Sequence, residues 1–295
     1  NTHNNLIKDT TMLHKIDKSP YFIKFYKFHL QDLVFSYNMQ TEWHHHPCIQ
    51  LSVSPHNSLM RVDTENESRQ VHGFIISSNI KHRLHSEGQL CFNLLIDLAN
   101  PLCHLLLHQM RGSDIVYLNQ ESSSLIANYF INCLQSEISP DIFILNNLLG
   151  KIEDCHCYQD KRIIKAASLI TELPVKCISS REISNQLYLS ESRFLHLFRE
   201  KMGTNFRSYL LWKRLHHAID EIHSSDSLTL LACNSGFSDG AHFSRTCMTL
   251  YGLRPSELKH ASKNRIQQVQ QKYFNLSSTL TGLNFTKKNI CVMNK

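Results

Sequence analysis

Residues 227–252 read SLTLLACNSGFSDGAHFSRTCMTLYG, and this stretch decides the fold of the C-terminal half of the chain. Its first part, up to Asn234, is short and apolar, and Gly236 breaks it, which predicts a short helix and a turn. Ser238 or Asp239 is suited to cap a second helix after the turn. The stretch therefore predicts two helices joined by a tight turn, the arrangement by which a second helix enters the major groove of DNA.

The same plan occurs earlier in the chain, where residues 179–203 read SSREISNQLYLSESRFLHLFREKMG. Ser179 or Ser180 is expected to cap the first helix and Ser190 the second, which a glycine ends at residue 203. The second helices of the two stretches begin about 49 residues apart. The sequence thus contains two helix-turn-helix patterns in tandem.

A long helix, predicted from about residue 205 to residue 222, joins the two patterns. At a rise of 1.5 Å per residue it spans about 27 Å. With its connections, this length suits two major-groove segments separated by one helical turn of about 34 Å. The alternative is an ordinary helical bundle whose loops imitate the turns.

On each second helix, the face opposite the apolar one would contact DNA. In the first helix this face holds Glu191, Ser192, Leu195, His196, Arg199 and Glu200, and in the second it holds Gly240, Ala241, Ser244, Arg245 and Met248. Arg245 is the best candidate for a base contact, because arginine binds guanine O6 and N7 through two hydrogen bonds. A phosphate contact or an intramolecular ion pair is the alternative for Arg245. Leu195 and Ala241 suit the methyl group of thymine.

Residues 178–260 resemble the AraC/XylS family of bacterial transcription regulators. The resemblance rests on residues 189–194, 232–239 and 242–245, and on Gly252 followed by Pro255 and Ser256. One departure is Cys247, which stands where the family usually has a phenylalanine, so we expect altered packing in the second unit without loss of the fold. The resemblance implies base contacts from Ser192, Leu195, His196, Ala241, Ser244 and Arg245. Arg193 and Arg199 are further DNA-binding candidates as positioning charges, and Gly240 and His242 are candidates because they lie on the second recognition helix.

Charge is distributed unevenly along the 295 residues, whose formal net charge is +6. Residues 1–154 carry 11 basic and 15 acidic side chains, residues 155–260 carry 14 and 10, and residues 261–295 carry six basic and no acidic ones. An acidic front and a basic back is the asymmetry expected when one part of a chain binds nucleic acid.

The front half reads as short strands separated by turn-forming clusters. Strands are predicted near residues 21–23, 33–37, 49–53, 59–62, 73–76 and 91–96, which indicates a small barrel or sandwich. Three apolar-periodic helices follow, near residues 102–110, 122–137 and 142–152. The predicted class is therefore α+β, with a cupin-like β-barrel followed by an all-α domain that carries two helix-turn-helix units.

Three histidines in the front half, His44, His46 and His82, give it a weaker resemblance to the cupin-type sensor barrel of such regulators. They match positions from which cupins draw metal ligands, but Gln50 stands where the usual carboxylate would be. Zinc or iron at this three-histidine site is one possibility. An effector pocket without metal, and no site at all, are the other two.

Four segments follow from these patterns: a sensor domain at 1–115, a helical linker or dimerisation segment at 116–157, a DNA-binding domain at 158–260 and a basic polar tail at 261–295. No signal peptide or membrane span is visible, and a cytoplasmic, nucleoid-associated bacterial protein is expected. The ten cysteines include no C-x-x-C pair, which disfavours a structural zinc site of common spacing.

The leading hypothesis is a regulator, not an enzyme, that binds promoter DNA and whose sensor domain responds to a small molecule or a stress signal. A homodimer is expected, with RNA polymerase as a possible partner and activation as the expected action. One alternative is a cupin-type metalloenzyme fused to a DNA-binding module. Another is a redox sensor that uses some of Cys48, Cys91, Cys103, Cys133, Cys155 and Cys157.

Overall fold

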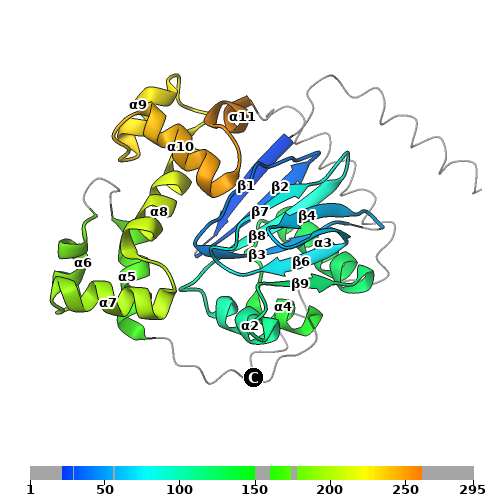
Figure 1. Ribbon diagram of the computed structural model, residues 1–295, viewed down its shortest axis with the longest axis horizontal. Coiled ribbons are helices and arrows are strands. Elements are labelled where there is room, and N and C mark those ends of the chain that lie inside the picture. Colours follow the sequence, from blue (N-terminus) through cyan, green and yellow to red (C-terminus); the bar gives the residue numbers. More distant parts are fainter. Residues whose placement is uncertain (1–21, 29, 56, 150–159, 174–177, 261–295) are drawn as a thin grey trace, which may run out of the picture.

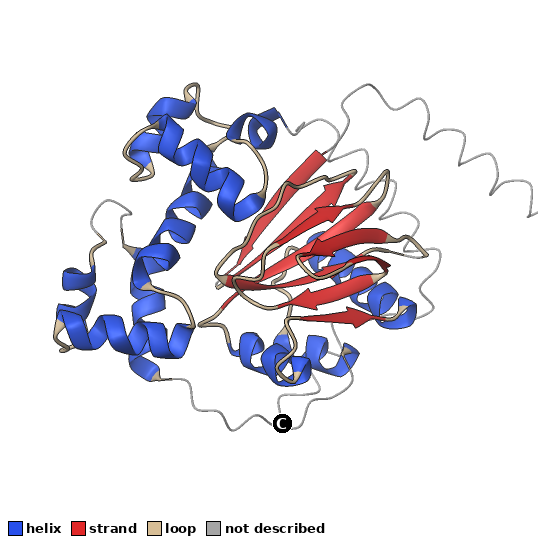
Figure 2. Ribbon diagram, in the orientation of Figure 1, coloured by secondary structure: helices blue, strands red, loops and turns tan. Residues whose placement is uncertain are grey.

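The structure is a computed structural model that describes residues 22–28, 30–55, 57–149, 160–173 and 178–260. A β-rich N-terminal half lies beside an all-helical C-terminal half (Figures 1 and 2). The predicted combination of a sheet region followed by a helical domain is therefore confirmed. The predicted tail at 261–295, and Cys155 and Cys157, lie outside the described residues.

Two antiparallel sheets form the N-terminal half. One has six strands in the order β1-β2-β8-β3-β6-β9, and the other has three in the order β5-β4-β7. No closed barrel forms among the described residues, because β1 and β9 each pair on one side only. The strands are β1 (Phe22–Phe28), β2 (Gln31–Tyr37), β3 (Cys48–Val53), β4 (Met60–Thr64), β5 (Ser68–Val71), β6 (Gly73–Ile76), β7 (His82–His85), β8 (Leu90–Asp97) and β9 (Ile115–Leu118).

Both faces of the six-stranded sheet are covered, as β8 illustrates. Phe92 and Leu94 pack in the core that includes α2 (Pro101–Met110) and α3 (Gln120–Ser136), whereas Cys91 and Leu95 pack with β4 and β7 of the small sheet. All eight residues of β8 are consequently buried. The alternation follows from the two-residue period of a strand.

The helices after the sheets pack on the large sheet rather than standing free. α3 buries Ile126, Ala127 and Phe130, and α4 (Ile142–Leu148) contributes Leu145 to the same core. β9 pairs with β6, so the sheet continues past residue 115, where the sequence placed the end of the sensor domain. Dimerisation through these helices stays a prediction.

Seven helices build the described C-terminal half, and side chains cap most of their N-termini. Asp160, Ser190 and Asp239 accept backbone N–H bonds at the positions predicted for caps. Ser179, rather than Ser180, caps α6. The helices are α5 (Lys161–Glu172), α6 (Ser180–Gln186), α7 (Glu191–Met202), α8 (Phe206–Glu221), α9 (Leu228–Asn234), α10 (Gly240–Tyr251) and α11 (Pro255–His260). Among the described helices, none has the length and apolar character needed to cross a membrane.

The two halves share their hydrophobic cores. The first core lies on the helix-covered face of the large sheet and extends to α5, α6, α7 and the start of α8. The second core lies between the two sheets and extends to the rest of α8 and to α9, α10 and α11. α8 contributes to both, through Tyr209 and Leu210 to the first and Trp212 and Leu215 to the second. The N-terminal half, which the sequence predicts to be a sensor and which is called the sensor half below, therefore contacts the helix that joins α7 to α10.

Candidate DNA-binding surface and sensor sites

α7 presents one buried and one exposed face. Phe194, Leu197 and Phe198 are buried against the neighbouring helices, with ring contacts from Phe194 and Phe198 to Phe206 of α8. The opposite face is exposed and includes all the DNA-contact candidates predicted for this helix, Ser192, Arg193, Leu195, His196 and Arg199. The structure thus places these five side chains on one free surface.

α10 repeats this division. Phe243 and Cys247 are buried, and Cys247 fills the position where the sequence led us to expect altered packing. Ala241 and Arg245 are exposed.

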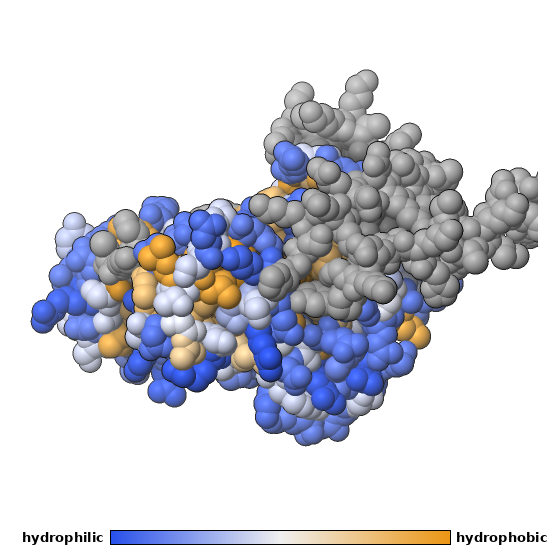
Figure 3. All heavy atoms as spheres, turned by 90° about the horizontal axis from the view of Figure 1, so that it is seen from above, coloured by the Kyte–Doolittle hydropathy of each residue, from blue (hydrophilic) through white to orange (hydrophobic). Residues whose placement is uncertain are grey.

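The other candidates on α10, Gly240, His242 and Ser244, are half-buried. The Nδ1 atom of His242 lies 3.2 Å from the Ser238 hydroxyl, which ties this histidine to the start of the helix. Of the five candidates on α10, Ala241 and Arg245 are therefore the most accessible to DNA. The face of the molecule seen from above in Figure 3 carries hydrophilic and hydrophobic patches over the helical half.

The three predicted histidines of the sensor half do come together. His44 pairs with His82 through a β-bridge at the start of β7, and His46 lies just before β3. The ring centroids are 4.3 Å apart for His44 and His82, 5.2 Å for His46 and His82, and 5.7 Å for His44 and His46. One ring nitrogen from each histidine lies within 4.8 Å of those of the other two.

Burial keeps this histidine cluster uncharged. It lowers the pKa of His44 to about 3 and that of His46 to about 4, and it lowers the pKa of His82 well below its usual value. Neutral imidazole is the form that binds metals. The cluster thus has the residue types and the protonation state of a metal site, without a carboxylate among its members.

Gln50 stands at the position of the missing carboxylate and is hydrogen-bonded on both sides. Its Oε1 lies 2.9 Å from His46 Nε2, and its Nε2 donates to Ser52 Oγ and Asn93 Oδ1. The two donations fix the amide so that its oxygen faces the histidines. Gln50 is buried and lines a small pocket together with His44, His46 and residues of both sheets, such as Val34 and Leu84.

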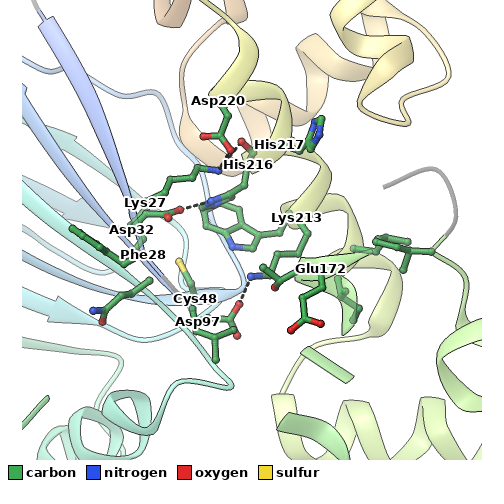
Figure 4. A pocket seen from close by; sticks show the side chains of 18 of the residues that line it. Lys27, Phe28, Asp32, Cys48, Asp97, Glu172, Lys213, His216, His217 and Asp220 are labelled. Atoms are coloured by element: carbon green, nitrogen blue, oxygen red, sulfur yellow. Dashed lines mark hydrogen bonds and ion pairs between the residues drawn. The ribbon is translucent and has the colours of Figure 1, made fainter. Parts of the chain in front are cut away.

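A cavity of about 690 Å³ opens between the sensor half and α8 (Figure 4). Ion pairs cross it: Lys27 of β1 lies 2.7 Å from Asp220 of α8, and Lys213 of α8 lies 2.7 Å from Asp97 of β8. The Tyr209 hydroxyl also donates to Asp97, over 2.6 Å. Polar side chains thus hold the two halves together around a cavity of mixed lining, in which apolar groups such as Ile170, Leu210 and Trp212 alternate with polar ones such as Thr171 and Glu172.

Asp32 of β2 contacts Nδ1 of His216 of α8 at this cavity, and burial lowers the pKa of that imidazole below its usual value. Burial alone would raise the pKa of Asp32, but His216, Lys27 and Lys213 together hold it below its usual value. Sequence reasoning missed this network. The available signal was an acidic residue at the end of a buried strand, Asp32 near the start of β2 or Asp97 at the end of β8, but the partners on α8 become neighbours only in the folded chain.

The described cysteines of the redox hypothesis are poorly suited to it. Cys48, Cys91, Cys103 and Cys133 are buried, and burial raises the pKa of each thiol, to about 12 for Cys91 and about 11 for Cys133. Because the thiolate is the reactive form, these four cysteines are placed as packing residues.

The chain is similar over part of its length to a helix-turn-helix family and to proteins named as regulators of transcription or of an operon. Residues 183–261 match a protein family described as a helix-turn-helix domain. Over 82 residues the chain is 37% identical to the "Probable transcriptional regulator LumQ" of Photobacterium leiognathi, and over 122 residues it is 26% identical to the arabinose operon regulatory protein of Escherichia coli strain K12. These matches span 28% and 41% of this chain, and 33% and 42% of the respective relatives.

The whole fold resembles that of ToxT from Vibrio cholerae. A crystal structure of an apo ToxT variant aligns with a TM-score of 0.51 and 15% identity, over 84% of this chain and 99% of that one. A structure of unsaturated fatty acid bound ToxT aligns with a TM-score of 0.50 and 14% identity, over 85% and 98%. At this identity the similarity establishes the fold alone.

Proposed function

Residues 183–261 are a DNA-binding domain of the AraC/XylS type, and from this premise we propose that the chain is a sequence-specific DNA-binding transcription regulator. In this proposal α6–α7 and α9–α10 act as two helix-turn-helix units. The observation that carries it is that α7 and α10 each bury one face and expose the other, and that α8 joins them. We assign the protein no catalytic role.

Base recognition by α10 is tested with Arg245→Ala, because Arg245 is the exposed cation on that helix. If Arg245 reads a guanine, the variant loses about 1–3 kcal/mol of affinity for a specific promoter fragment and little for random DNA. Fluorescence anisotropy on both fragments measures the difference. Arg69→Ala, on β5 of the sensor half, is the matched control, and equal losses on both DNAs would reduce Arg245 to a phosphate contact.

The effector is proposed to be an amphipathic acid bound in the cavity beside α8. The similar ToxT fold has been solved with an unsaturated fatty acid bound. In this chain the cavity has apolar side chains such as Leu210 and Trp212 next to the two lysines Lys27 and Lys213, whose acidic partners in the cavity an added carboxylate would displace. Such a ligand would bias the contact between the sensor half and α8 and thereby shift DNA binding.

Oleic acid and methyl oleate distinguish this proposal from nonspecific apolar binding. The acid is expected to raise the thermal unfolding temperature more than the ester, and Lys27→Gln is expected to remove the difference. Lys24→Gln, on the same strand, is the control. Equal stabilisation by acid and ester would refute the anionic effector while leaving DNA binding untouched.

The remaining proposals concern the oligomeric state of the protein and its place of action. A homodimer is favoured by exposed apolar side chains on and beside α3 and α4, namely Leu125, Ile138 and Phe143, of which Phe143 is 71% exposed. The site of action is proposed to be the nucleoid, with RNA polymerase contacted from the promoter. Light scattering on the full chain tests the dimer, and a monomer mass at micromolar concentration would exclude it.

A further inference from the structure

The buried histidine cluster of His44, His46 and His82 lies directly against the C-terminal end of α10. The backbone N–H of His45 donates to the carbonyl of Thr249, and that of Glu42 donates to the carbonyl of Gly252, over 3.0 and 2.9 Å. A Cβ atom on Gly252 would lie 2.9 Å from His44 Nδ1. The segment that carries two of the histidines is therefore also the surface on which α10 rests.

Backbone contacts already orient two of the rings. The Nδ1 atoms of His44 and His82 lie 2.9 and 2.8 Å from the carbonyls of Glu42 and Ile80. A neutral ring that donates from Nδ1 carries its lone pair on Nε2, and this is the arrangement in which metal-binding histidines are commonly held.

His82 supplies an independent sign of a missing ligand. Its side chain is 0% exposed, and its Nε2 has no hydrogen-bond partner among the described residues. A buried polar atom without a partner is uncommon in folded proteins and calls for an explanation, and His82 belongs to a group whose ligand atoms lie within 4.8 Å of one another. A bound cation would give the Nε2 atom of His82 a partner.

His46 is able to join the site by changing its tautomer. In one tautomer its Nε2 donates to Gln50 Oε1, 2.9 Å away; in the other its Nδ1 donates to the Cys48 carbonyl, 3.2 Å away, and Nε2 is free to bind. In the second case Gln50 Oε1 lies beside the ion as a further oxygen donor. Three imidazoles and an amide oxygen suit a borderline divalent ion such as Zn²⁺ or Co²⁺.

We propose that His44, His46 and His82 bind a divalent transition-metal ion, and that the bound ion stiffens residues 42–46 and so controls how α10 is held. The regulatory part rests on the proposed DNA-binding function, whereas the metal site does not. The ring centroid of His46 also lies 5.6 Å from that of Trp212, and the Trp212 ring stacks on Tyr251 at the end of α10. Through His44 and His46, a bound ion would thus be linked to residues 42–46 and to Trp212, both of which pack against the end of α10.

Cobalt binding to the chelator-treated full chain tests the site. The wild type is expected to bind about one Co²⁺ per chain with visible absorption of a nitrogen-ligated ion, and Zn²⁺ is expected to displace it. His82→Gln is expected to weaken binding at least tenfold, in the range found for losses of metal-site groups. His82→Phe provides a second variant that fills the buried volume, and circular dichroism checks the fold of both.

His108→Ala is the matched control, because His108 is an exposed histidine on α2. Unchanged affinity in both His82 variants, or no Co²⁺ bound by the wild type, would overturn the metal site. DNA affinity is then measured with and without Zn²⁺. A severalfold change in the wild type and none in His82→Gln supports the coupling, and an unchanged DNA affinity in metal-loaded wild type refutes it. A chain that binds metal but no specific DNA would instead refute the proposed function.

Discussion

The docking of α10 on the sensor half is tested by replacing one glycine with alanine. Gly252 ends α10 with φ +65°, and a Cβ atom there would lie 2.4 Å from the Glu42 carbonyl oxygen and 2.9 Å from the Glu42 nitrogen. Gly203 ends α7 in the same left-handed conformation, with φ +62°, but a Cβ atom there would have no neighbour within 4 Å among the described residues. The two glycines differ in their surroundings and not in their backbone.

The expected magnitudes follow from this difference. Gly203→Ala costs about 1–2 kcal/mol of folding free energy, the penalty of placing an L-residue in the left-handed region. Gly252→Ala carries the same penalty, and it also forces α10 away from residues 42–45. The move breaks the two backbone hydrogen bonds from Glu42 and His45, each contributing about 0.5–1.5 kcal/mol, so the excess loss is about 1–3 kcal/mol.

Urea unfolding of the full chain, followed by tryptophan fluorescence, measures both losses. Trp212 reports on the region directly, because it packs between His46 and Tyr251. Equal losses for the two variants would refute the contact between α10 and the sensor half, since the backbone penalty alone would then account for both.

Three further predictions concern the interface and the recognition helix. Tyr209→Phe removes the hydroxyl that donates to the buried Asp97 carboxylate, so it should cost about 1.5–3 kcal/mol in urea unfolding; a loss under about 0.5 kcal/mol would contradict the 2.6 Å bond. Asp32→Asn should destabilise the protein at neutral pH, where the Asp32 carboxylate is charged. The difference in unfolding free energy from wild type should shrink as the pH falls below about 4, because a carboxyl whose pKa is lowered by folding stabilises the folded state only while it is ionised. A pH-independent difference would contradict the contact with His216. Ser190→Ala should cost about 1 kcal/mol in thermal or urea unfolding by removing the cap of α7, and a neutral effect would contradict the Ser190–Arg193 backbone bond.

Local signals predicted the helical half well. Caps such as Asp160, Ser190 and Asp239 and terminators such as Gly203 act within one turn of a helix, so the sequence alone contains their effect. The exposed candidates on α7 were predicted for the same reason, since a helix face is fixed by its period. Their role in DNA binding stays a prediction.

The sheet region was predicted less well, because some strands exist only through their neighbours. β5 (Ser68–Val71) is polar and mostly exposed, and it pairs with β4 at the edge of the small sheet. β7 (His82–His85) and β9 (Ile115–Leu118) are four residues long and were also missed. Short strands carry too little hydrophobic alternation to be recognised without the partner that they pair with.

The sites divide in the same way. His44, His46 and His82 were named from a sequence pattern, and the fold brings them together. The interface network of Asp32, Asp97 and α8 was not named, because its members are far apart in sequence, by 112 residues in the case of Asp97 and Tyr209. Long-range pairing of this kind depends on how the two halves dock.

The position of α8 affects both the spacing of the proposed DNA-binding helices and the shape of the cavity. The same helix sets the separation of α7 and α10 and forms one wall of the cavity through Trp212, Lys213 and His216. Under the proposed function, in which α7 and α10 each bind one half-site, any event that shifts α8 alters the phasing of the two half-sites. If the effector changes the affinity of the protein for one operator by a given factor, then binding of that operator changes the affinity for the effector by the same factor. Operators with different spacer lengths should therefore change the effector affinity by different factors. The response to one signal would then be graded from promoter to promoter by spacer length alone.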